Sequence, residues 1–441
     1  MRRWWCDGLM VAGALGFAVV QQPRVKVGLG AVQQDRALTE WRPLANGQPA
    51  SPEKQRILLL MSDTGGGHRA SAEAIAHALE KLFPERWECE ILDIWTEHAA
   101  WPYSNFVPFY SFLAKKPMLW RMLWIYGNFP LTRFAQEKAA ALSCFKRFKQ
   151  VLEERIEDLD VVVSVHPLCQ TIPLRALRKL KRGVPFVTVV TDLASAHPTW
   201  FHRGVDKCFV PSKAIYDKAR RCGLPTDKLV SRGLPLRAPF WEQEHRTQPE
   251  VRQHLGLPDV PSVLVMGGGD GVGRIARVAK TIASELRDEA SLVVICGKNE
   301  AAKRELETYD WPDHVRPSIL GFVSNIEEYM AAADCVVTKA GPGTIAEAAT
   351  RGLPVVLSSF LPGQEAGNVK FVVKTHEFGV FKRRPKKIAR EIRRLLEDDA
   401  TRHSMAARAL EAAKPDATTD IARDIARLVD TKIAKNPTDL K

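Results

Sequence analysis

The sequence predicts two doubly wound α/β domains that face a central cleft, and three observations lead to this fold class. Short apolar runs alternate with amphipathic stretches from Gln55 onward, which is the pattern of parallel strands joined by helices. A proline-containing stretch at 238–250 interrupts the alternation, which then begins again. Three of the expected strands end in glycine-rich turns. Because doubly wound sheets bind ligands beyond the carboxyl ends of their strands, these turns place the functional site in the cleft.

The first half of the chain contains its expected elements in close order. Residues 57–61 form a continuous apolar run, which predicts a buried strand. After a glycine-rich turn, apolar residues recur at helical spacing from position 72 to 83 and stop at Pro84, which predicts a helix. Further strands are expected at 90–94, 161–165, 186–190 and 208–210.

The second half repeats this order. Strands are expected at 262–266, 292–296, 335–338 and 355–358, and helices at 275–286 and 345–349. After Pro415, apolar residues at 421, 425, 428, 429 and 433 predict a terminal helix that must dock on another element. We therefore expect two domains, 51–245 and 246–415, followed by a helical tail at 416–441.

Residues 1–50 are set apart from the fold and are expected to form a targeting or flexible segment. The apolar stretch 8–20 follows Arg2 and Arg3 and is shorter than the ~20 residues that span a bilayer. A basic excess up to Arg36 favours a transit peptide, although no Ser or Thr precedes Thr39. A truncated start is the alternative interpretation.

Composition limits the classes of protein to consider. The 441 residues are 45% hydrophobic and 26% charged, which is typical of a globular protein and excludes a disordered or collagen-like chain. A formal net charge of +13 indicates an acidic partner, such as a nucleic acid, an anionic membrane surface or a phosphorylated ligand. The eight cysteines are scattered without a Cys-x-x-Cys pair, which favours reduced thiols over a zinc or disulfide framework.

The three glycine-rich turns contain Gly67, Gly269, and Gly341 with Gly343. Glycine lets main-chain N–H groups approach an oxyanion, and the helix that follows favours negative charge. The turns therefore predict a ligand with a diphosphate group. Neither G-x-G-x-x-G nor G-x-x-x-x-G-K-[ST] occurs, which disfavours a dinucleotide fingerprint and a P-loop. Tight turns without a ligand are the alternative.

His68 lies between a triple glycine and the first helix, at the carboxyl end of the first expected strand. An imidazole with a pKa of about 6.5 is well suited to act there as a general base. A segment after another strand gathers Asp192, His197, Trp200 and His202. The two histidines of this segment lack an acidic or cysteine partner at ligand spacing, so a zinc site is disfavoured and no obligatory metal is expected.

Other polar positions have competing interpretations. Asp158 and Asp160 form a D-x-D pattern, but they precede a strand and so face the wrong end of the sheet for a metal–diphosphate pair. Glu347 lies one turn into a helix, where it could hold a ribose diol or only favour the helix dipole. Gln364 and Glu365 follow the next strand and offer an amide and a carboxylate to sugar hydroxyls.

Four motifs occur in order along the chain: Met61-Ser-Asp-Thr-Gly-Gly-Gly-His-Arg69, His197-Pro-Thr-Trp-Phe-His202, Lys339-Ala-Gly-Pro-Gly-Thr-Ile-Ala-Glu347 and Pro362-Gly-Gln-Glu-Ala-Gly-Asn368. Over residues 56–382 the chain resembles monogalactosyldiacylglycerol synthases, which are family-28 glycosyltransferases of plants and algae. The resemblance implies a GT-B fold of two Rossmann-like domains, UDP-galactose as donor, diacylglycerol as acceptor and inversion to a β-galactolipid. It also implies a monotopic protein of the chloroplast envelope membrane, for which the N-terminal segment is atypical.

The resemblance also implies roles for individual residues. His68 looks like the catalytic base, and Asp192 like a buried orienting carboxylate or an alternative base. Glu347 looks like the ribose ligand, while Gln364 and Glu365 look like galactose ligands. The remaining donor ligands are expected to be Gly67, Gly269, Lys298, Gly341, Gly343 and Thr344 at the diphosphate, Phe322 and Val323 at uracil, and Asn368 in the galactose loop.

The first domain is expected to hold the acceptor and to contact the membrane, and the second to bind the UDP-sugar. His197, Pro198 and Trp200 are expected near the acceptor. The segment 101–129 contains ten aromatic residues, no Asp or Glu, and the basic residues Lys115, Lys116 and Arg121. Aromatic rings and cations favour the headgroup boundary of a bilayer, so this segment, with Trp120 and Trp124, predicts membrane contact. A pair of core helices is the alternative.

Two other functions stay open. The same fold could transfer a different sugar, from UDP-glucose or UDP-N-acetylglucosamine, to another lipid. A basic nucleic-acid-binding protein is suggested only by the charge, and the sequence contains no recognisable nucleic-acid module. The expected partners are therefore UDP-galactose, diacylglycerol and anionic membrane lipids, without nucleic acid, and the oligomeric state is left open.

Overall fold

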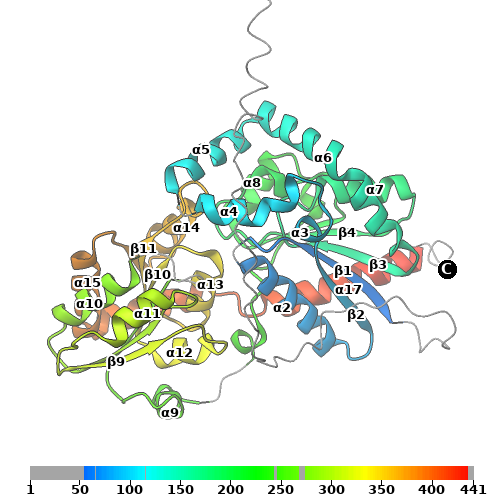
Figure 1. Ribbon diagram of the computed structural model, residues 1–441. Coiled ribbons are helices and arrows are strands. Elements are labelled where there is room, and N and C mark those ends of the chain that lie inside the picture. The colour runs from blue at the N-terminus through cyan, green and yellow to red at the C-terminus, as the bar shows by residue number, and fades with distance from the viewer. Residues whose placement is uncertain (1–53, 65, 115, 243–245, 268–273, 436–441) are drawn as a thin grey trace, which may run out of the picture. The chain divides into compact units, whose positions relative to one another are not determined.

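The computed structural model describes residues 54–64, 66–114, 116–242, 246–267 and 274–435, all of which belong to one compact unit that runs from Glu40 to Lys441. The expected targeting segment 1–50, Gly269 and Lys115 lie outside the described residues, and so do residues 243–245, next to the expected domain boundary. Within the described part, the chain forms two six-stranded sheets whose paired strands are all parallel (Figure 1).

The first sheet has the strand order β2-β1-β3-β4-β5-β6. Its central strand β1 is buried from Ile57 to Met61, as expected of a parallel strand that is covered on both faces. The strands are β1 (Gln55–Met61), β2 (Trp87–Asp93), β3 (Leu159–Ser164), β4 (Phe186–Val189), β5 (Lys207–Val210) and β6 (Leu229–Ser231).

The second sheet has the order β12-β11-β10-β7-β8-β9. Its strands are β7 (Ser262–Met266), β8 (Ala290–Ile295), β9 (Val315–Leu320), β10 (Cys335–Lys339), β11 (Val355–Ser359) and β12 (Gly379–Phe381). The two sheets confirm the predicted fold class of two doubly wound α/β halves. The strands β6, β9 and β12 were not predicted.

Helices join these strands in both halves. Those of the first half are α2 (Gly67–Leu82), α3 (Ile94–His98), α4 (Phe106–Ala114), α5 (Pro117–Asn128), α6 (Pro130–Glu153), α7 (Thr171–Leu180) and α8 (Lys213–Arg221). Those of the second half are α9 (Gln248–His254), α10 (Ile275–Glu285), α11 (Glu300–Glu307), α12 (Ile326–Ala332), α13 (Pro342–Thr350), α14 (Ala366–Lys370), α15 (Pro385–Glu397) and α16 (Asp399–Ala412). The last described helix is α17 (Ala417–Lys435).

Alternate residues of each central strand enter two different cores, because side chains alternate across a strand. In β1, Ile57 and Leu59 contact a cluster that includes residues of α2 and α17. The neighbouring Leu58 and Leu60 belong to a cluster on the opposite face with residues of α6 and α7. In the second sheet, α10 and α15 contribute to one face and α12 and α13 to the other.

The terminal helix α17 returns to the first sheet after the second domain is complete. Figure 1 shows α17 beside α2, and Ile421 and Ile425 are buried against the first sheet. Thr418, itself fully buried, accepts a hydrogen bond from the Leu236 amide at 2.8 Å and donates one to the Leu236 carbonyl at 2.9 Å. The predicted docking of the terminal helix is therefore confirmed, and its partner is the first half of the chain.

Candidate active site

The first site element is the turn between β1 and α2. Gly66 has a φ of +75° and ends the turn, and α2 begins at Gly67 without a side-chain cap. A Cβ built on Gly67 would meet no atom within 4 Å. The first N–H groups of α2 therefore have no side-chain cap, and His68 lies in the first turn of this helix.

The position of His68 is fixed by contacts of one ring nitrogen. Its Nδ1 lies 2.8 Å from the main-chain oxygen of Val165 and 3.0 Å from Thr191 Oγ1. Because a carbonyl oxygen can only accept, Nδ1 carries the proton and Nε2 keeps its lone pair. Burial lowers the pKa of His68 to about 4, although the bond to Val165 and the charge of Asp63 oppose this shift. The imidazole is therefore neutral at physiological pH.

A second histidine, His166, was missed by the sequence analysis. Its ring packs edge-on against His68 with centroids 4.5 Å apart. Its Nδ1 accepts from the Leu168 amide at 3.3 Å, so Nε2 carries the proton and faces Thr64 Oγ1 at 3.1 Å. Burial and the neighbouring His68 lower the pKa of His166 well below its ordinary value. The available signal was its position just after a buried strand, the same signal that identified His68.

Asp192 is buried beside the His68 contacts, one residue after Thr191. Trp200, fully buried in the core, donates from Nε1 to Asp192 Oδ2 at 2.7 Å. Burial raises the pKa of Asp192 to about 6, while hydrogen bonds from Trp200 and Gln364 lower it. Trp200 thus orients Asp192 from inside the protein, and in this structure it has no exposed surface for an acceptor.

The loop after β11 brings the expected galactose ligands to Asp192. The side chain of Gln364 lies near enough to Asp192 to lower the pKa of that carboxyl, and its buried Oε1 has no partner among the described residues. Ser195 donates to the Gln364 main-chain oxygen at 2.5 Å. Glu365 is buried, pairs with Lys339 at 2.7 Å and accepts from the Leu361 amide at 2.7 Å. A sugar hydroxyl is the kind of donor that the Gln364 oxygen lacks.

Asn368 joins this loop to both halves of the chain. Its Oδ1 accepts from the Ala194 amide at 3.0 Å, and its Nδ2 donates to the Ala340 carbonyl at 2.9 Å. The side chain is buried. Asn368 therefore holds the loop in place through main-chain partners, and its expected role as a ligand stays a prediction.

The helix α13 begins at the second described glycine turn. Gly341 is its N-cap residue and provides no side-chain cap, and a Cβ built on Gly343 would meet no atom within 4 Å. Thr344 lies in the first turn, and Glu347 lies one turn further along. Burial raises the pKa of Glu347, partly opposed by Arg237. Its carboxylate accepts no hydrogen bond from a described residue, so it is available to a ligand.

The structure connects some predicted residues and leaves others apart. Contacts run from His68 through Thr191 to the Asp192 segment, and from there to Gln364. Lys298 is exposed after β8, Phe322 is 65% exposed after β9, and Val323 beside it is partly buried. Among the described residues, no hydrogen bond, ion pair or ring contact joins these three to His68 or Gln364. Asp158 and Asp160 contact Arg56 at the start of β1, which is the opposite end of the sheet.

The expected acceptor and membrane residues gather around α5. Trp124 packs edge-on against His197 with ring centroids 5.2 Å apart, and Pro198 begins the short helical turn Pro198–Trp200. Trp120 is buried against Tyr110 of α4. Lys116 is exposed and lies over the ring of Phe112. These positions agree with a segment that has one packed face and one exposed face.

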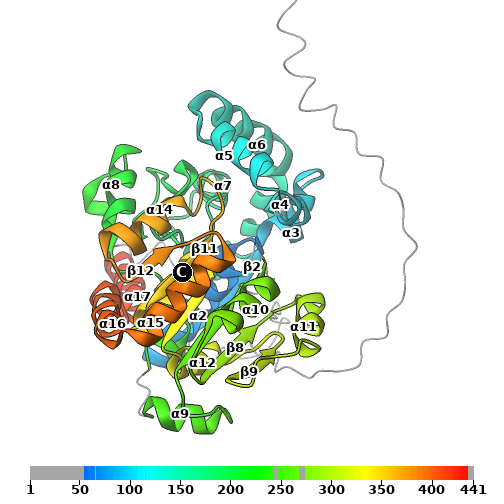
Figure 2. The ribbon, with the colours of Figure 1, turned by 90° about the vertical axis from the view of Figure 1, so that its left-hand side faces the viewer.

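The exposed face is strongly apolar. In both views α5 and α6 lie side by side (Figures 1 and 2). Met118, Met122 and Ile125 of α5 expose 81%, 66% and 58% of their surface. The exposed large hydrophobic residues from Trp101 to Leu142, which we call the apolar face, are Trp101, Phe109, Phe112, Met118, Leu119, Met122, Ile125, Tyr126, Phe129, Leu131, Phe134 and Leu142. In the described part of the chain, no helix is both long enough and apolar enough to span a bilayer.

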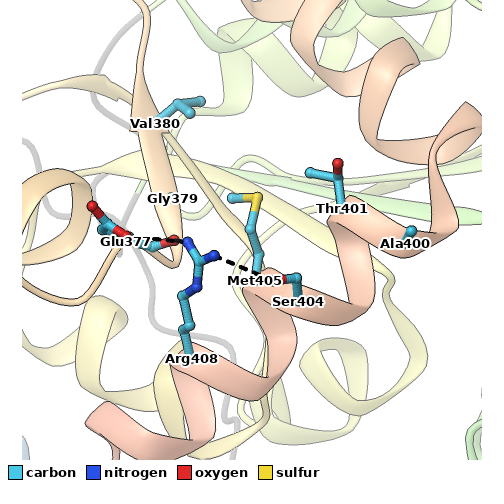
Figure 3. A pocket seen from close by; sticks show the side chains of 8 residues that line it. All are labelled: Glu377, Gly379, Val380, Ala400, Thr401, Ser404, Met405 and Arg408. Carbon is cyan, nitrogen blue, oxygen red and sulfur yellow. Dashed lines mark hydrogen bonds and ion pairs between the residues drawn. The ribbon is translucent and has the colours of Figure 1, made fainter.

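Two other features bear on ligands. Within the described residues, no three His, Cys, Asp or Glu side chains are grouped as a metal site. A surface cavity of about 410 Å³ lies between β12 and α16, where Arg408 contacts Glu377 and Ser404 (Figure 3). None of its lining residues is a predicted site residue. The candidate site is therefore the cluster around His68, Asp192 and Gln364.

Comparison with known proteins identifies the family of this chain. Residues 68–236, which begin at His68, match the family model described as monogalactosyldiacylglycerol (MGDG) synthase. The chloroplastic monogalactosyldiacylglycerol synthase of Spinacia oleracea is 41% identical over 396 residues, which cover 88% of this chain and 74% of the relative. This chain belongs to the monogalactosyldiacylglycerol synthase family. Residues 262–421 match the C-terminal domain of glycosyltransferase family 28.

Further relatives of the synthase family and solved structures agree. Monogalactosyldiacylglycerol synthase 1 of Arabidopsis thaliana, also chloroplastic, is 38% identical and covers 98% of this chain and 81% of its own length. MurG of Acinetobacter baumannii superimposes with a TM-score of 0.55 at 17% identity, covering 85% of this chain and 99% of MurG. HepE of Anabaena in complex with UDP-glucose gives 0.51 at 15% identity, with 85% and 99% covered. These structures confirm the GT-B fold.

Proposed function

We propose that this chain transfers galactose from UDP-galactose to 1,2-diacylglycerol with inversion, and that His68 is the general base. Membership of the synthase family supports the substrates. The observation that carries the base assignment is the bond from His68 Nδ1 to the Val165 carbonyl, which leaves Nε2 unprotonated. A neutral imidazole with an unprotonated nitrogen can accept the proton of the attacking hydroxyl.

The reaction is a single in-line displacement. The acceptor hydroxyl attacks C1 of galactose from the face opposite UDP, and its proton passes to His68 Nε2 as the new bond forms. The C1–O bond to UDP breaks, and the leaving diphosphate gains negative charge. The uncapped first turn of α13, with Gly343 facing open space, offers main-chain N–H groups and a helix dipole to that charge. Gln364 and Glu365 would orient the sugar, and Glu347 the ribose.

The acceptor stays in a bilayer, so the enzyme must reach it from the membrane surface. We assign this contact to the apolar face, which has the composition of an interfacial surface and exposes Lys116 and Arg121 beside it. The chloroplastic relatives support a location on the plastid envelope. Anionic lipids are the partners that these cations favour.

The activity is tested by incubating the protein with labelled UDP-galactose and diacylglycerol vesicles, followed by chromatography of the lipids. We expect a labelled monogalactosyl lipid with a β linkage. Competition by UDP-glucose and UDP-N-acetylglucosamine separates this proposal from transfer of another sugar. Preferred transfer of glucose or N-acetylglucosamine would contradict the proposed donor.

Replacement of His68 by Ala tests the base. We expect kcat to fall by roughly 10²–10⁴, the usual contribution of a general base, while the affinity for UDP stays within about threefold of wild type. His77→Ala is the matched control, because His77 is exposed on the same helix and lies outside the site. If kcat of His68→Ala stayed within a few-fold of the His77→Ala value, another group would have to be the base.

A further inference from the structure

Trp124 of α5 lies directly against the main chain of Gly363, in the loop that carries the expected galactose ligands. A Cβ built on Gly363 would lie 2.4 Å from Trp124 Cδ1 and 2.8 Å from Nε1. Gly363 also has a φ of +88°, which side-chain-bearing residues rarely adopt. The indole therefore occupies the space that a side chain at position 363 would fill. Its contact with Gly363 limits how closely the main chain of this loop can approach α5.

The loop that Trp124 contacts is held by further contacts at the two residues after Gly363. The main-chain oxygen of Gln364 accepts a hydrogen bond from Ser195, and its side chain lies near Asp192. Glu365 is buried in its pair with Lys339. A shift of Gly363 must therefore be passed to the next two residues, whose polar groups are the ones offered to the sugar.

The other contacts of α5 hold Trp124 in this place. The Trp124 ring packs edge-on on His197, and a Cβ on Gly127 would lie only 2.9 Å from His197 Nε2. Positions 120, 124 and 127 thus form the packed face of α5, at helical spacing. Met118, Met122 and Ile125 lie on the opposite, exposed face. One helix therefore touches the donor loop with one face and presents the apolar face with the other.

We propose that Trp124 is a positioning residue for the donor sugar: it holds the loop at Gly363 so that Gln364 and Glu365 meet the galactose of UDP-galactose. The proposal rests on the proposed function, because it takes that loop to be the sugar site. Trp124 itself contacts neither substrate in this role. Its removal costs sugar binding because the loop must then be ordered at the moment of binding.

Replacement of Trp124 by Ala should weaken UDP-galactose more than UDP. We expect the dissociation constant of UDP-galactose to rise about tenfold, the cost of lost preorganisation at one loop, and that of UDP to change less than about twofold, measured by titration calorimetry without lipid. Trp124→Phe keeps a ring against Gly363 and should recover most of the affinity. Met122→Ala, on the exposed face of the same helix, should bind both nucleotides like wild type.

A cycle with Gly363 isolates the contact itself. In wild type, Gly363→Ala introduces both an unfavourable φ and a clash with the indole, whereas in Trp124→Ala the unfavourable φ remains and the clash with the indole is absent. The loss of UDP-galactose affinity caused by Gly363→Ala should therefore be smaller in the Trp124→Ala background.

Two results would overturn the proposal. One is an equal loss of UDP and UDP-galactose affinity in Trp124→Ala, which would mean general damage to the domain. The other is equal cost of Gly363→Ala in both backgrounds, which would mean that the contact does not matter. Wild-type protein that transfers glucose instead of galactose would contradict the proposed function alone, since the Trp124 comparison can be repeated with UDP-glucose.

Discussion

His68 owes the protonation of its Nδ1 and its free Nε2 to partners 97 and 123 residues away in the chain. Val165 fixes which ring nitrogen carries the proton, and Thr191 contacts that same nitrogen. Neither partner can be recognised from the motif around His68, because both arrive through the parallel order of β1, β3 and β4. The sequence identified the residue, and the fold determines its tautomer.

Asp192 is a buried charge whose removal should stabilise the protein. Burial raises its pKa from 3.8 to about 6, so the folded state binds more protons than the unfolded state between these values. The stabilisation is present below pH 3.8 and is lost as pH rises through about 6. Asp192→Asn should therefore raise the free energy of unfolding at pH 7.5 by about 1–3 kcal/mol, the upper limit following from about 1.4 kcal/mol per pKa unit, as measured by denaturant unfolding.

The pH dependence separates charge from packing in this variant. Well below pH 3.8, where Asp192 is protonated in both the folded and the unfolded state, the two proteins should unfold alike. The oxygen of the introduced amide can still accept from Trp200, so this bond is kept. The burial of a charge would be contradicted if the variant were less stable than wild type at pH 7.5. It would also be contradicted if the free energy of unfolding differed from that of wild type by the same amount at both pH values.

At the scale of elements, the strands that the sequence analysis missed all lie at sheet edges. β6, β9 and β12 are edge strands in their sheets. β6 and β12 have three residues each, and β9 contains Pro317 and exposed Arg316. An edge strand has one unpaired side and so needs no long apolar run, and it tolerates proline. Central strands, which must be apolar on both faces, were predicted to within about three residues at their ends.

The helix α5 shows why its function was harder to predict than its existence. Its aromatic residues are dense enough to mark the segment, but they divide between two faces with different partners. Trp120 and Trp124 are packed, whereas Met118, Met122 and Ile125 are exposed. Composition alone supported both membrane contact and a core helix pair, and the helix combines packed and exposed faces. The contact with Gly363 joins residues 239 positions apart and leaves no signal in either segment.

Charge reversal beside the apolar face should weaken membrane binding. Lys116 and Arg121 are exposed, and cations near an anionic surface contribute about 1 kcal/mol each. Lys116→Glu with Arg121→Glu should therefore lower co-sedimentation with anionic vesicles by at least about tenfold in partition constant, since about 1.4 kcal/mol corresponds to a factor of ten. UDP affinity in the absence of vesicles should not change.

A matched charge change elsewhere controls for the net charge of the protein. Lys54 and Arg287 are exposed and precede β1 and β8, at the amino ends of the two sheets. Lys54→Glu with Arg287→Glu changes the net charge by the same amount away from the apolar face. Equal loss of vesicle binding in both double variants would contradict a localised contact and would indicate attraction by overall charge.

For the whole molecule, the chain forms the two sheets in sequence and then returns to the first. α17 covers the first sheet together with α2, and Thr418 ties it to Leu236. The loop after β11 in the second half bonds to residues 192–195 of the first. The two halves of the chain are thus joined by contacts at the candidate site as well as by the chain.

These contacts predict that lipid and UDP-galactose bind cooperatively. α5 packs on His197 and Gly363 with one face and exposes Met118, Met122 and Ile125 on the other, so we expect a bilayer that binds the exposed face to favour the seated position of the helix. Coupling requires that vesicles bind the protein more tightly when α5 is seated than when it is not. A ligand that binds both positions of α5 equally does not shift the equilibrium between them. Vesicles of phosphatidylcholine and phosphatidylglycerol, without acceptor, should tighten UDP-galactose binding by about three- to tenfold, a common size of coupling between sites.

Linkage makes this prediction testable from both sides. UDP-galactose must tighten vesicle binding by the same factor as vesicles tighten UDP-galactose binding, because coupling free energies are reciprocal. Titration calorimetry with vesicles gives the first factor, and co-sedimentation with increasing UDP-galactose gives the second. In Trp124→Ala both factors should fall to about one, since α5 then no longer touches the donor loop. A coupling that persists in Trp124→Ala would have to run through another contact between the two halves, and equal UDP-galactose affinity with and without vesicles in wild type would refute the coupling.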